Sequence, residues 1–261
     1  MGVRRRKFLT GITALGISIP VISMSSTTSE NSFNYDTDVV AHRGCSSKLQ
    51  DNSLQSIQCA ISSGADGMEL DVRKTKDNYL VLSHDNLRYT NSKISLISTT
   101  KLRRLQESHK VIKLEKAFEL ISDKDIKLYV GLKVPEALPE ILQKAREYNV
   151  VDKIGFQGWS VDYFKPIQNE DIETVLAGTF PSERYIKKAV ESNIDCVMPH
   201  YTSQNLTYYH EYAREKGLES GCWAINETDE DIKLALQTQP DFILTNKPIT
   251  ALKYLDRYDN R

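Results

Sequence analysis

Short apolar, β-branched runs recur along the chain from residue 37, and each is followed by a longer segment with helical periodicity. Amphipathic patterns of this kind cover residues 52–63, 136–148, 182–192 and 204–216, and Thr228 begins a further one. Strand-then-helix units of about 25–30 residues, eight in all, predict a parallel sheet that closes into a (β/α)8 TIM barrel. The predicted strands are 38–42, 67–72, 126–132, 153–157, 173–178, 194–199, 220–225 and 241–245.

One segment departs from this alternation. Only residues 74–78 separate the second strand from the apolar run that follows, and this is too short for a parallel crossover. Residues 79–84 should therefore return antiparallel, as a small hairpin insertion after the second strand. Residues 86–125 form a longer excursion with helical patterns at 100–107 and 114–122. No Pro- or Gly-rich linker divides residues 37–261, which predicts one domain.

The first 36 residues have a different character. Residues 1–25 join a basic head to a weakly apolar run and resemble a twin-arginine signal peptide, in which Arg5 and Arg6 precede x-Phe-Leu. The apolar run is too short to span a bilayer, so no membrane-spanning segment is expected in the mature chain. Residues 26–36 read as a polar tether. The resemblance implies an exported prokaryotic protein; the alternative is a flexible basic tail.

Charge and cysteine content limit the partners. The formal net charge of −1 argues against nucleic acid, because there is no basic excess to displace counterions. The cysteines Cys45, Cys59, Cys196 and Cys222 lack metal-ligand spacing. They could form disulfides outside the cell, with Cys45 and Cys222 the most suggestive because both are predicted near strand ends. They could equally be small buried hydrophobic residues.

Ionisable and polar residues gather where the predicted strands end, which is where a TIM barrel places its active site. Glu69 and Asp71 are two residues apart, so both point to the same face of their strand. Two adjacent carboxylates favour a hard divalent cation. The remaining strand-end residues are His42, Arg43, His84, Lys133, Gln157, Thr179, His200, Trp223 and Asn246.

This combination indicates phosphodiester cleavage. Arg43 and Lys133 add positive charge that suits an anionic phosphate. His42 and His84 could supply a general base and a general acid near neutral pH. A cation and basic side chains would neutralise the charge that develops on the phosphate.

The sequence resembles the glycerophosphodiester phosphodiesterase family over about residues 37–250. "HRG" at 42–44, "ELD" at 69–71 and "HD" at 84–85 match the family pattern, with "LYVGLKVPEA", "CWAIN" and "PDFILTNKP" in the places of its later motifs. The resemblance implies His42 and His84 as the acid–base pair and Arg43 as a phosphate contact. It also implies one Mg²⁺ or Ca²⁺ ion on Glu69 and Asp71, Lys133 in the phosphate or metal shell, and Trp223 as an apolar wall for the alcohol.

Two departures from the pattern bear on activity. Asp51 replaces the glutamate of the family's E-N-T motif and is a candidate third metal ligand. Gly131 replaces the third metal-binding glutamate, and on its strand it should share a face with Lys133.

The leading hypothesis is an exported, metal-dependent hydrolase that converts glycerophosphodiesters to an alcohol and glycerol phosphate. Two alternatives remain open. One is a phospholipase-D-like enzyme acting on lysophospholipids or sphingolipids, and the other is a catalytically weakened phosphodiester-binding protein. The substrate class is in each case a small-molecule or lipid-derived phosphodiester. The sequence predicts no oligomeric state.

Overall fold

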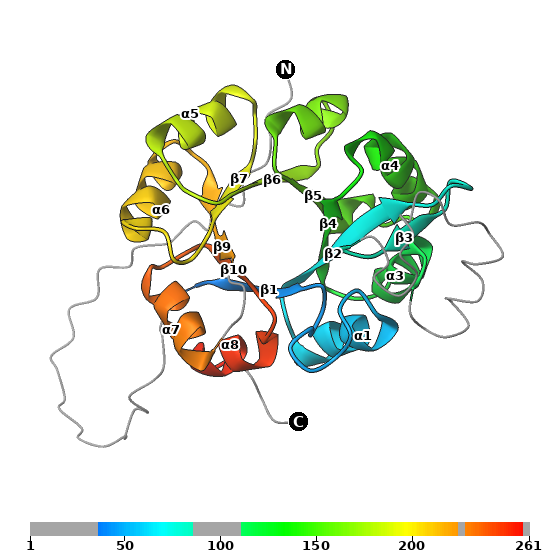
Figure 1. Ribbon diagram of the computed structural model, residues 1–261, viewed down its shortest axis with the longest axis horizontal. Coiled ribbons are helices and arrows are strands. Elements are labelled where there is room, and N and C mark those ends of the chain that lie inside the picture. Colours follow the sequence, from blue (N-terminus) through cyan, green and yellow to red (C-terminus); the bar gives the residue numbers. More distant parts are fainter. Residues whose placement is uncertain (1–35, 86–110, 224–227, 258–261) are drawn as a thin grey trace, which may run out of the picture.

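A ring of parallel strands surrounded by helices forms the core of the protein (Figure 1). The computed structural model describes residues 36–85, 111–223 and 228–257. The ring follows the chain order, which confirms the predicted TIM barrel. Its strands are β1 (Asp38–His42), β2 (Gly67–Lys74), β4 (Lys127–Leu132), β5 (Ile154–Gly158), β6 (Glu173–Gly178), β7 (Cys196–Pro199), β8 (Glu219–Ser220), β9 (Cys222–Trp223) and β10 (Phe242–Thr245).

The predicted strand at 220–225 is divided at Gly221. β8 pairs with β7, whereas β9 pairs with β10, which in turn pairs with β1. A β-carbon on Gly221 would lie 2.4 Å from the ring of Phe242, so the close approach of the chain to Phe242 at this position requires glycine. β8 and β9 together therefore take the place of a single barrel strand between β7 and β10.

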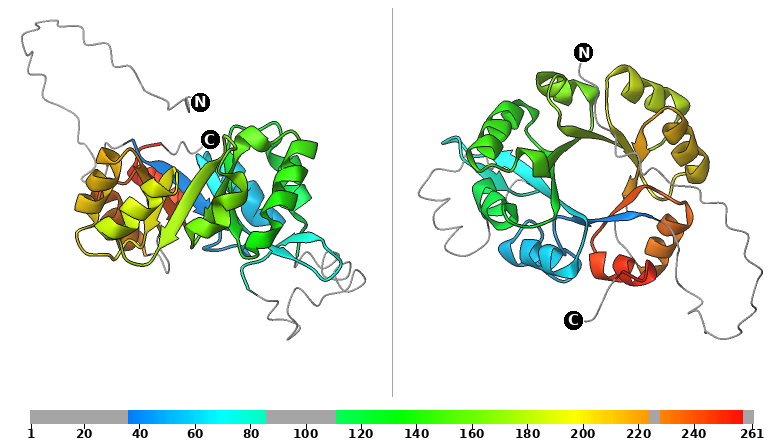
Figure 2. Two further views of the ribbon diagram at one scale, coloured as in Figure 1. Left: turned by 90° about the horizontal axis from the view of Figure 1, so that it is seen from above. Right: turned by 180° about the vertical axis from the view of Figure 1, so that it is seen from behind.

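Helices cover the outside of the ring (Figure 2). Ser53 caps α1 (Leu54–Ser63) and Thr228 caps α7 (Asp229–Gln237), in both cases through a capping box, and the helix start that the sequence predicts at Thr228 is confirmed. Between β5 and β6, where the strand–helix alternation implies an α-helix, the chain instead forms a 3₁₀ segment, η4 (Val161–Ile167), which contains Pro166. The α-helices are α1 (Leu54–Ser63), α3 (Leu114–Ile121), α4 (Leu138–Glu147), α5 (Glu183–Glu191), α6 (Leu206–Glu215), α7 (Asp229–Gln237) and α8 (Pro248–Tyr254), and two further short 3₁₀ turns are η2 (Pro135–Ala137) and η3 (Val151–Lys153).

The hairpin prediction is confirmed. β3 (Leu80–Leu82) pairs antiparallel with β2, with Val72 opposite Leu82. The predicted signal peptide, the tether up to residue 35 and the helical pattern at 100–107 lie outside the described residues. Across the described ranges, no helix combines the length and the apolar character that crossing a bilayer requires.

Side chains alternate between the two faces of the barrel strands. On β2, Leu70 and Val72 pack outward in the core between strands and helices, so Glu69 and Asp71 face the barrel interior. Apolar groups fill that interior, where the rings of Tyr129 and Phe242 stack with centroids 6.5 Å apart. The polar residues of the site therefore lie at one end of a packed barrel rather than in a pore.

Candidate active site

Three neighbouring strands bring the predicted site residues together at the carboxyl end of the barrel. His42 ends β1 and lies opposite Glu69 on β2. Asp71 lies opposite Gly131 on β4, and Lys133 follows Gly131 by two residues. Because the hydrogen-bonded register fixes these neighbours, the strands themselves position the charged groups.

Asp71 is the electrostatic centre of the site. Its side chain is 2% exposed, and its carboxylate contacts Lys133 Nζ at 3.0 Å and Arg43 Nε at 3.1 Å. Burial acts to raise the pKa of Asp71, but the charges of Lys133 and Arg43 outweigh it, so the pKa lies below its usual value. Asp71 is therefore held as a carboxylate between two cations.

Asn52 fixes the orientation of Asp71 and was not singled out from the sequence. Its Nδ2 donates to Asp71 Oδ2 at 3.0 Å, and its Oδ1 accepts from the backbone N–H of Asp71 at 2.9 Å. Asn52 has a φ of 53°, in the left-handed region that asparagine tolerates better than most residues. Its place directly after Asp51, as the asparagine of the family's E-N-T motif, is the signal that could have identified it.

Glu69 is buried beside Asp71 with less support. Burial and then the Asp71 charge raise its pKa well above the usual value. Glu69 Oε2 has no hydrogen-bond partner and lies 4.0 Å from His42 Nε2. A buried oxygen without a partner, next to a second carboxylate, fits a cation, and Mg²⁺ commonly takes one or two carboxylates plus waters and phosphate oxygens.

Asp51 stands apart from this pair. Asp51 Oδ2 lies 3.3 Å from Arg43 Nη1, and its side chain is 46% exposed. Among the described residues, it forms no three-ligand group with Glu69 and Asp71. Its role as a third ligand stays a prediction.

The two histidines have different partners. His42 Nδ1 lies 2.7 Å from Asn246 Oδ1, which also accepts from the Ser46 hydroxyl at 2.8 Å. Burial, followed by the charge of Arg43, lowers the pKa of His42 to about 4. His84 Nδ1 instead lies 2.8 Å from the Asp85 carboxylate. Burial, with the charges of Lys133 and Arg43, lowers the pKa of His84, although the nearby acids oppose this shift.

Arg73 holds the backbone that carries His84. Its Nε and Nη2 both donate to the His84 carbonyl oxygen, at 2.9 and 2.7 Å. Arg73 follows Asp71 by two residues on β2, so one strand supplies both a carboxylate of the site and the support for His84. The sequence analysis did not predict this contact.

Aromatic side chains occupy the other side of the same barrel end. Trp223, at the end of β9, donates from Nε1 to the Gly178 carbonyl at 3.1 Å. Its ring meets Trp159 edge-on at 5.6 Å and His200 at 4.6 Å. Trp159 and Phe180 follow β5 and β6 and are 48% and 79% exposed. The structure thus brings the predicted Trp223 and His200 together and adds Trp159.

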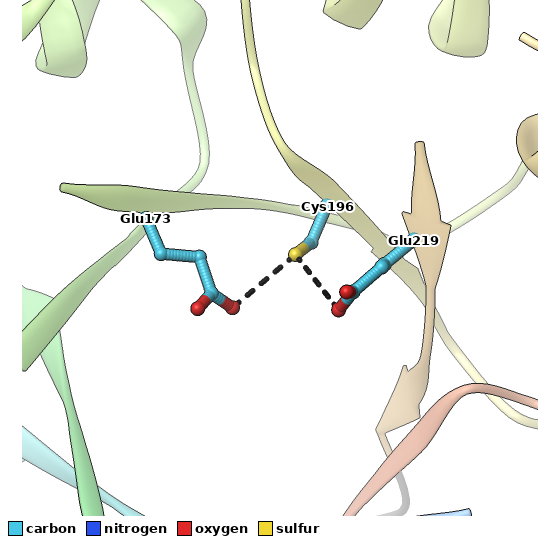
Figure 3. A group of neighbouring side chains, drawn as sticks. All are labelled: Glu173, Cys196 and Glu219. Atoms are coloured by element: carbon cyan, nitrogen blue, oxygen red, sulfur yellow. Dashed lines mark hydrogen bonds between the residues drawn. The ribbon is translucent and has the colours of Figure 1, made fainter. Parts of the chain in front are cut away.

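A second group of ligand-type side chains lies at the opposite end of the barrel. Cys196 Sγ lies 3.3 Å from Glu173 Oε1 and 3.7 Å from Glu219 Oε2 (Figure 3). These residues begin β7, β6 and β8, so they mark the amino ends of the strands. Within the described part of the chain, this is the one group that places three ligand atoms within 4.8 Å of one another, and it could hold a metal ion. Glu173 also pairs with Lys127.

The structure shows a cysteine pairing that the sequence left open. Cys45 forms a disulfide with Cys59 on α1, across 14 residues of chain. Cys222 is buried and is not disulfide-bonded. The suggestion from strand ends is confirmed for Cys45 and wrong for Cys222, because the loop after β1 packs on α1 and places Cys59 within bonding distance of Cys45.

The sequence model described as the glycerophosphoryl diester phosphodiesterase family matches residues 42–250, well over half of the chain. The chain belongs to this family. A glycerophosphodiester phosphodiesterase of Caldanaerobacter subterraneus is 34% identical over 136 residues, which cover 45% of this chain and 56% of that protein. The chain thus spans about half the length of the curated relatives it matches.

Solved structures of the glycerophosphodiester phosphodiesterase family share the barrel. The enzyme of Thermotoga maritima is 25% identical with a TM-score of 0.69, covering 83% of this chain and 97% of that one. An Oleispira antarctica phosphodiesterase, solved with the product sn-glycerol-3-phosphate, is 18% identical with a TM-score of 0.72, covering 84% and 96%. At these identities the likeness supports the fold assignment.

Within the family frame, Gly131 is the main departure, and the structure shows where its side chain would point. A β-carbon on Gly131 would lie 2.2 Å from Glu69 Oε1 and 3.1 Å from Asp71 Oδ1. This agrees with the expectation that the replaced glutamate faces the site. The site therefore has two carboxylates, Glu69 and Asp71, whereas the family pattern has three.

Proposed function

We propose that this protein hydrolyses glycerophosphodiesters to an alcohol and glycerol phosphate. The observation that carries the proposal is the contact of Arg43 and Lys133 with buried Asp71, at 3.1 and 3.0 Å, beside Glu69 and within the barrel end that holds His42. Guanidinium and ammonium groups fixed in this way suit a phosphate better than a neutral substrate.

The hydrogen-bond partners divide the acid and base roles between the histidines. The Asn246 amide oxygen accepts from His42, which places the imidazole proton on Nδ1 and leaves Nε2 able to accept a proton. His42 would therefore activate the nucleophile, either water or a neighbouring hydroxyl of the substrate. The Asp85 carboxylate accepts from His84 Nδ1 and opposes the lowering of the His84 pKa, so we assign His84 as the group that would protonate the departing alcohol.

Glu69 and Asp71 would hold a single Mg²⁺ or Ca²⁺ ion. When bound, such an ion neutralises charge on the phosphoryl oxygens. Arg43 and Lys133 bind the same phosphate from the protein side and orient it between the two histidines. The family is generally metal-dependent, which supports this part of the proposal.

Export is part of the same proposal. A disulfide such as Cys45–Cys59 persists in oxidising compartments and is rare in the cytosol, so it supports the export that the twin-arginine-like segment predicts. Replacing Arg5 and Arg6 by lysine should retain the full-length chain in the cytoplasm. Intact-mass analysis of cell fractions would test this, and an unchanged distribution would contradict it.

Hydrolysis of glycerophosphocholine with added Mg²⁺, Ca²⁺ or Mn²⁺ tests the activity. We expect turnover in the wild type, and His42→Ala and His84→Ala should each reduce kcat by about 10²–10⁴-fold. Lys187→Ala, on exposed α5, is the control and should be unaffected. No turnover in the wild type, with activity appearing in Gly131→Glu, would instead support a weakened phosphodiester-binding protein.

The exposed aromatic residues favour a second candidate, a phospholipase-D-like activity on lysophospholipids. Trp159 and Phe180 offer apolar surface beyond the needs of a small alcohol. Trp159→Ala should then raise KM for a lysophospholipid several-fold more than KM for glycerophosphocholine. Tyr208→Ala is the matched control, since Tyr208 is 47% exposed on α6. Equal changes for both substrates would contradict the lipid reading.

A further inference from the structure

Gly131 lies directly beside the two buried carboxylates and carries no side chain of its own. A side chain here would begin 2.2 Å from Glu69 Oε1, so the Glu69 carboxylate occupies the space that such a side chain would take. Because Gly131 pairs with Asp71 in the β2–β4 register, any substituent would also point at Asp71. The position therefore controls how many carboxylates meet at this point.

Basic side chains already contact one of the two buried carboxylates of the site. Two carboxylates, Glu69 and Asp71, face two cations. Lys133 Nζ contacts Asp71 Oδ1, and Arg43 Nε contacts Asp71 Oδ2, which also accepts from Asn52. Both oxygens of Asp71 are thus engaged, whereas Glu69 Oε2 has no hydrogen-bond partner.

A divalent cation that enters alone meets an unfavourable arrangement. On Glu69, the buried oxygen Oε2 has no hydrogen-bond partner and is available to bind it, whereas both oxygens of Asp71 are engaged. To reach Asp71, the ion would have to displace Lys133 and Arg43 from it; Arg43 would keep its contact with Asp51 at 3.3 Å, whereas Lys133 would lose its contact with Asp71 Oδ1. Like charges brought together in a buried site repel strongly, because little water screens them.

A phosphate group changes this balance. Its oxygens accept hydrogen bonds from Arg43 and Lys133, which releases the Asp71 carboxylate. They also supply the oxygen ligands that a hard cation needs beyond one or two carboxylates. We infer that a divalent cation and a phosphate ester bind this site as a pair, each raising the affinity for the other, because Gly131 leaves the site one carboxylate short of holding the cation alone.

This inference rests on the proposed function and can be tested without turnover. Mn²⁺ binding to metal-free protein is measured from the EPR signal of the free ion, with and without saturating sn-glycerol 3-phosphate. We expect Mn²⁺ to bind about tenfold or more tightly with the phosphate ester, and calorimetry should show the same factor for the ester with Mn²⁺. A Cys196→Ala background removes the other candidate metal group from both titrations.

Two variants isolate the cause. Gly131→Glu should bind Mn²⁺ tightly without the ester and lose most of the coupling. Lys133→Gln removes a competing cation, so it should strengthen Mn²⁺ binding in the absence of the ester, and it carries the test if Gly131→Glu does not fold. Lys187→Gln, which removes an exposed lysine of α5, is the charge-matched control and should keep the wild-type coupling.

Equal Mn²⁺ affinity with and without the ester would overturn the inference, as would the absence of Mn²⁺ binding under both conditions. Hydrolysis of glycerophosphocholine in excess metal is measured separately. Turnover without coupled binding would leave the proposed function standing and reject the pairing. Coupled binding without turnover would support the pairing and reject the proposed function.

Discussion

At the residue scale, Asp71 shows which contacts a sequence can and cannot predict. Its spacing from Glu69 and its place at a strand end predict its direction correctly. Its bond with Asn52 spans 19 residues and depends on a left-handed turn after β1. Such a contact follows from how the loop folds back on β2, which hydrophobic periodicity does not encode. The direction of position 131 could be predicted, because Gly131 and Lys133 are two residues apart on one strand and therefore share a face.

Asn52→Ala tests the support of Asp71. The change removes two hydrogen bonds to a buried carboxylate residue, so we expect the free energy of unfolding to fall by about 1–3 kcal/mol. The value of kcat/KM should also fall, because Asp71 loses its fixed orientation. Urea denaturation and steady-state kinetics measure the two effects.

Asn78→Ala is the matched control, because Asn78 also has a left-handed backbone, with a φ of 63°, but lies in the exposed hairpin turn. It should show the backbone cost of losing asparagine and leave kcat/KM unchanged. An equal loss of activity in both variants would show that Asn52 has no special link to the site.

At the element scale, the β2–β3 hairpin is the unit that completes the site. The short connection at residues 74–78 predicted its antiparallel return, and the pairing of Val72 with Leu82 confirms it. The position of the His84 main chain was not predictable in this way, because Arg73 fixes it through a side chain. The 3₁₀ segment η4 also escaped prediction, since Pro166 disfavours the α-helix that barrel alternation implied.

Arg73→Gln tests this positioning role. Losing the two bonds to the His84 carbonyl should lower kcat with little change in KM, and it should shift the limb of the pH–rate profile that reports His84. Arg73→Lys should retain part of the activity. Lys74→Gln, which breaks a neighbouring pair with Glu140, is the control. A fall in stability with an unchanged pH profile would show that Arg73 is a structural residue and does not position His84.

The Cys45–Cys59 disulfide joins the loop after β1 to α1. Its partners could not be assigned from the sequence, because the pairing depends on how this loop packs. Replacing both cysteines by serine should lower the free energy of unfolding by about 3 kcal/mol, given the 14-residue separation. Thermal unfolding with and without reductant measures this.

Reductant should destabilise the wild type but have no further effect on the double serine variant. A Cys196→Ala, Cys222→Ala variant should respond to reductant as the wild type does, since neither residue forms a disulfide. Wild-type protein that is insensitive to reductant would contradict the assignment.

At the scale of the whole molecule, the barrel separates two polar ends. The carboxyl ends of the strands carry the histidines and the Glu69–Asp71 pair, whereas the amino ends carry Glu173, Cys196 and Glu219. The strand order was predictable from alternation alone. The amino-end group was not, because its residues are 23 positions apart and meet only once the barrel closes.

His210 makes global stability depend on pH. It is a fully buried residue of α6 whose ring nitrogens contact the hydroxyls of Ser220 and Thr238, and burial, followed by the charge of Arg214, lowers its pKa from 6.5 to about 3. The unfolded chain therefore takes up this proton first as pH falls. The contribution of His210 is complete above pH 6.5 and should fall by about 1.4 kcal/mol per pH unit below it, until the pH reaches the folded pKa.

Denaturation of the wild type and His210→Gln at pH 8 and pH 5 measures this. The variant is expected to start less stable at pH 8, because its amide does not reproduce both hydrogen bonds, but to lose less between the two values. Parallel losses in the two proteins would show that other groups control the acid response.

The two ends of the barrel strand β1 have a practical consequence. Asp38 begins it and His42 ends it, so the preceding chain joins the barrel at the end opposite the histidines. The last described residue, Arg257, also bonds there, through the Thr37 carbonyl oxygen. The described chain therefore enters and leaves the barrel at the end opposite His42, so a handle joined directly before residue 36 or after residue 257 would be attached on that side.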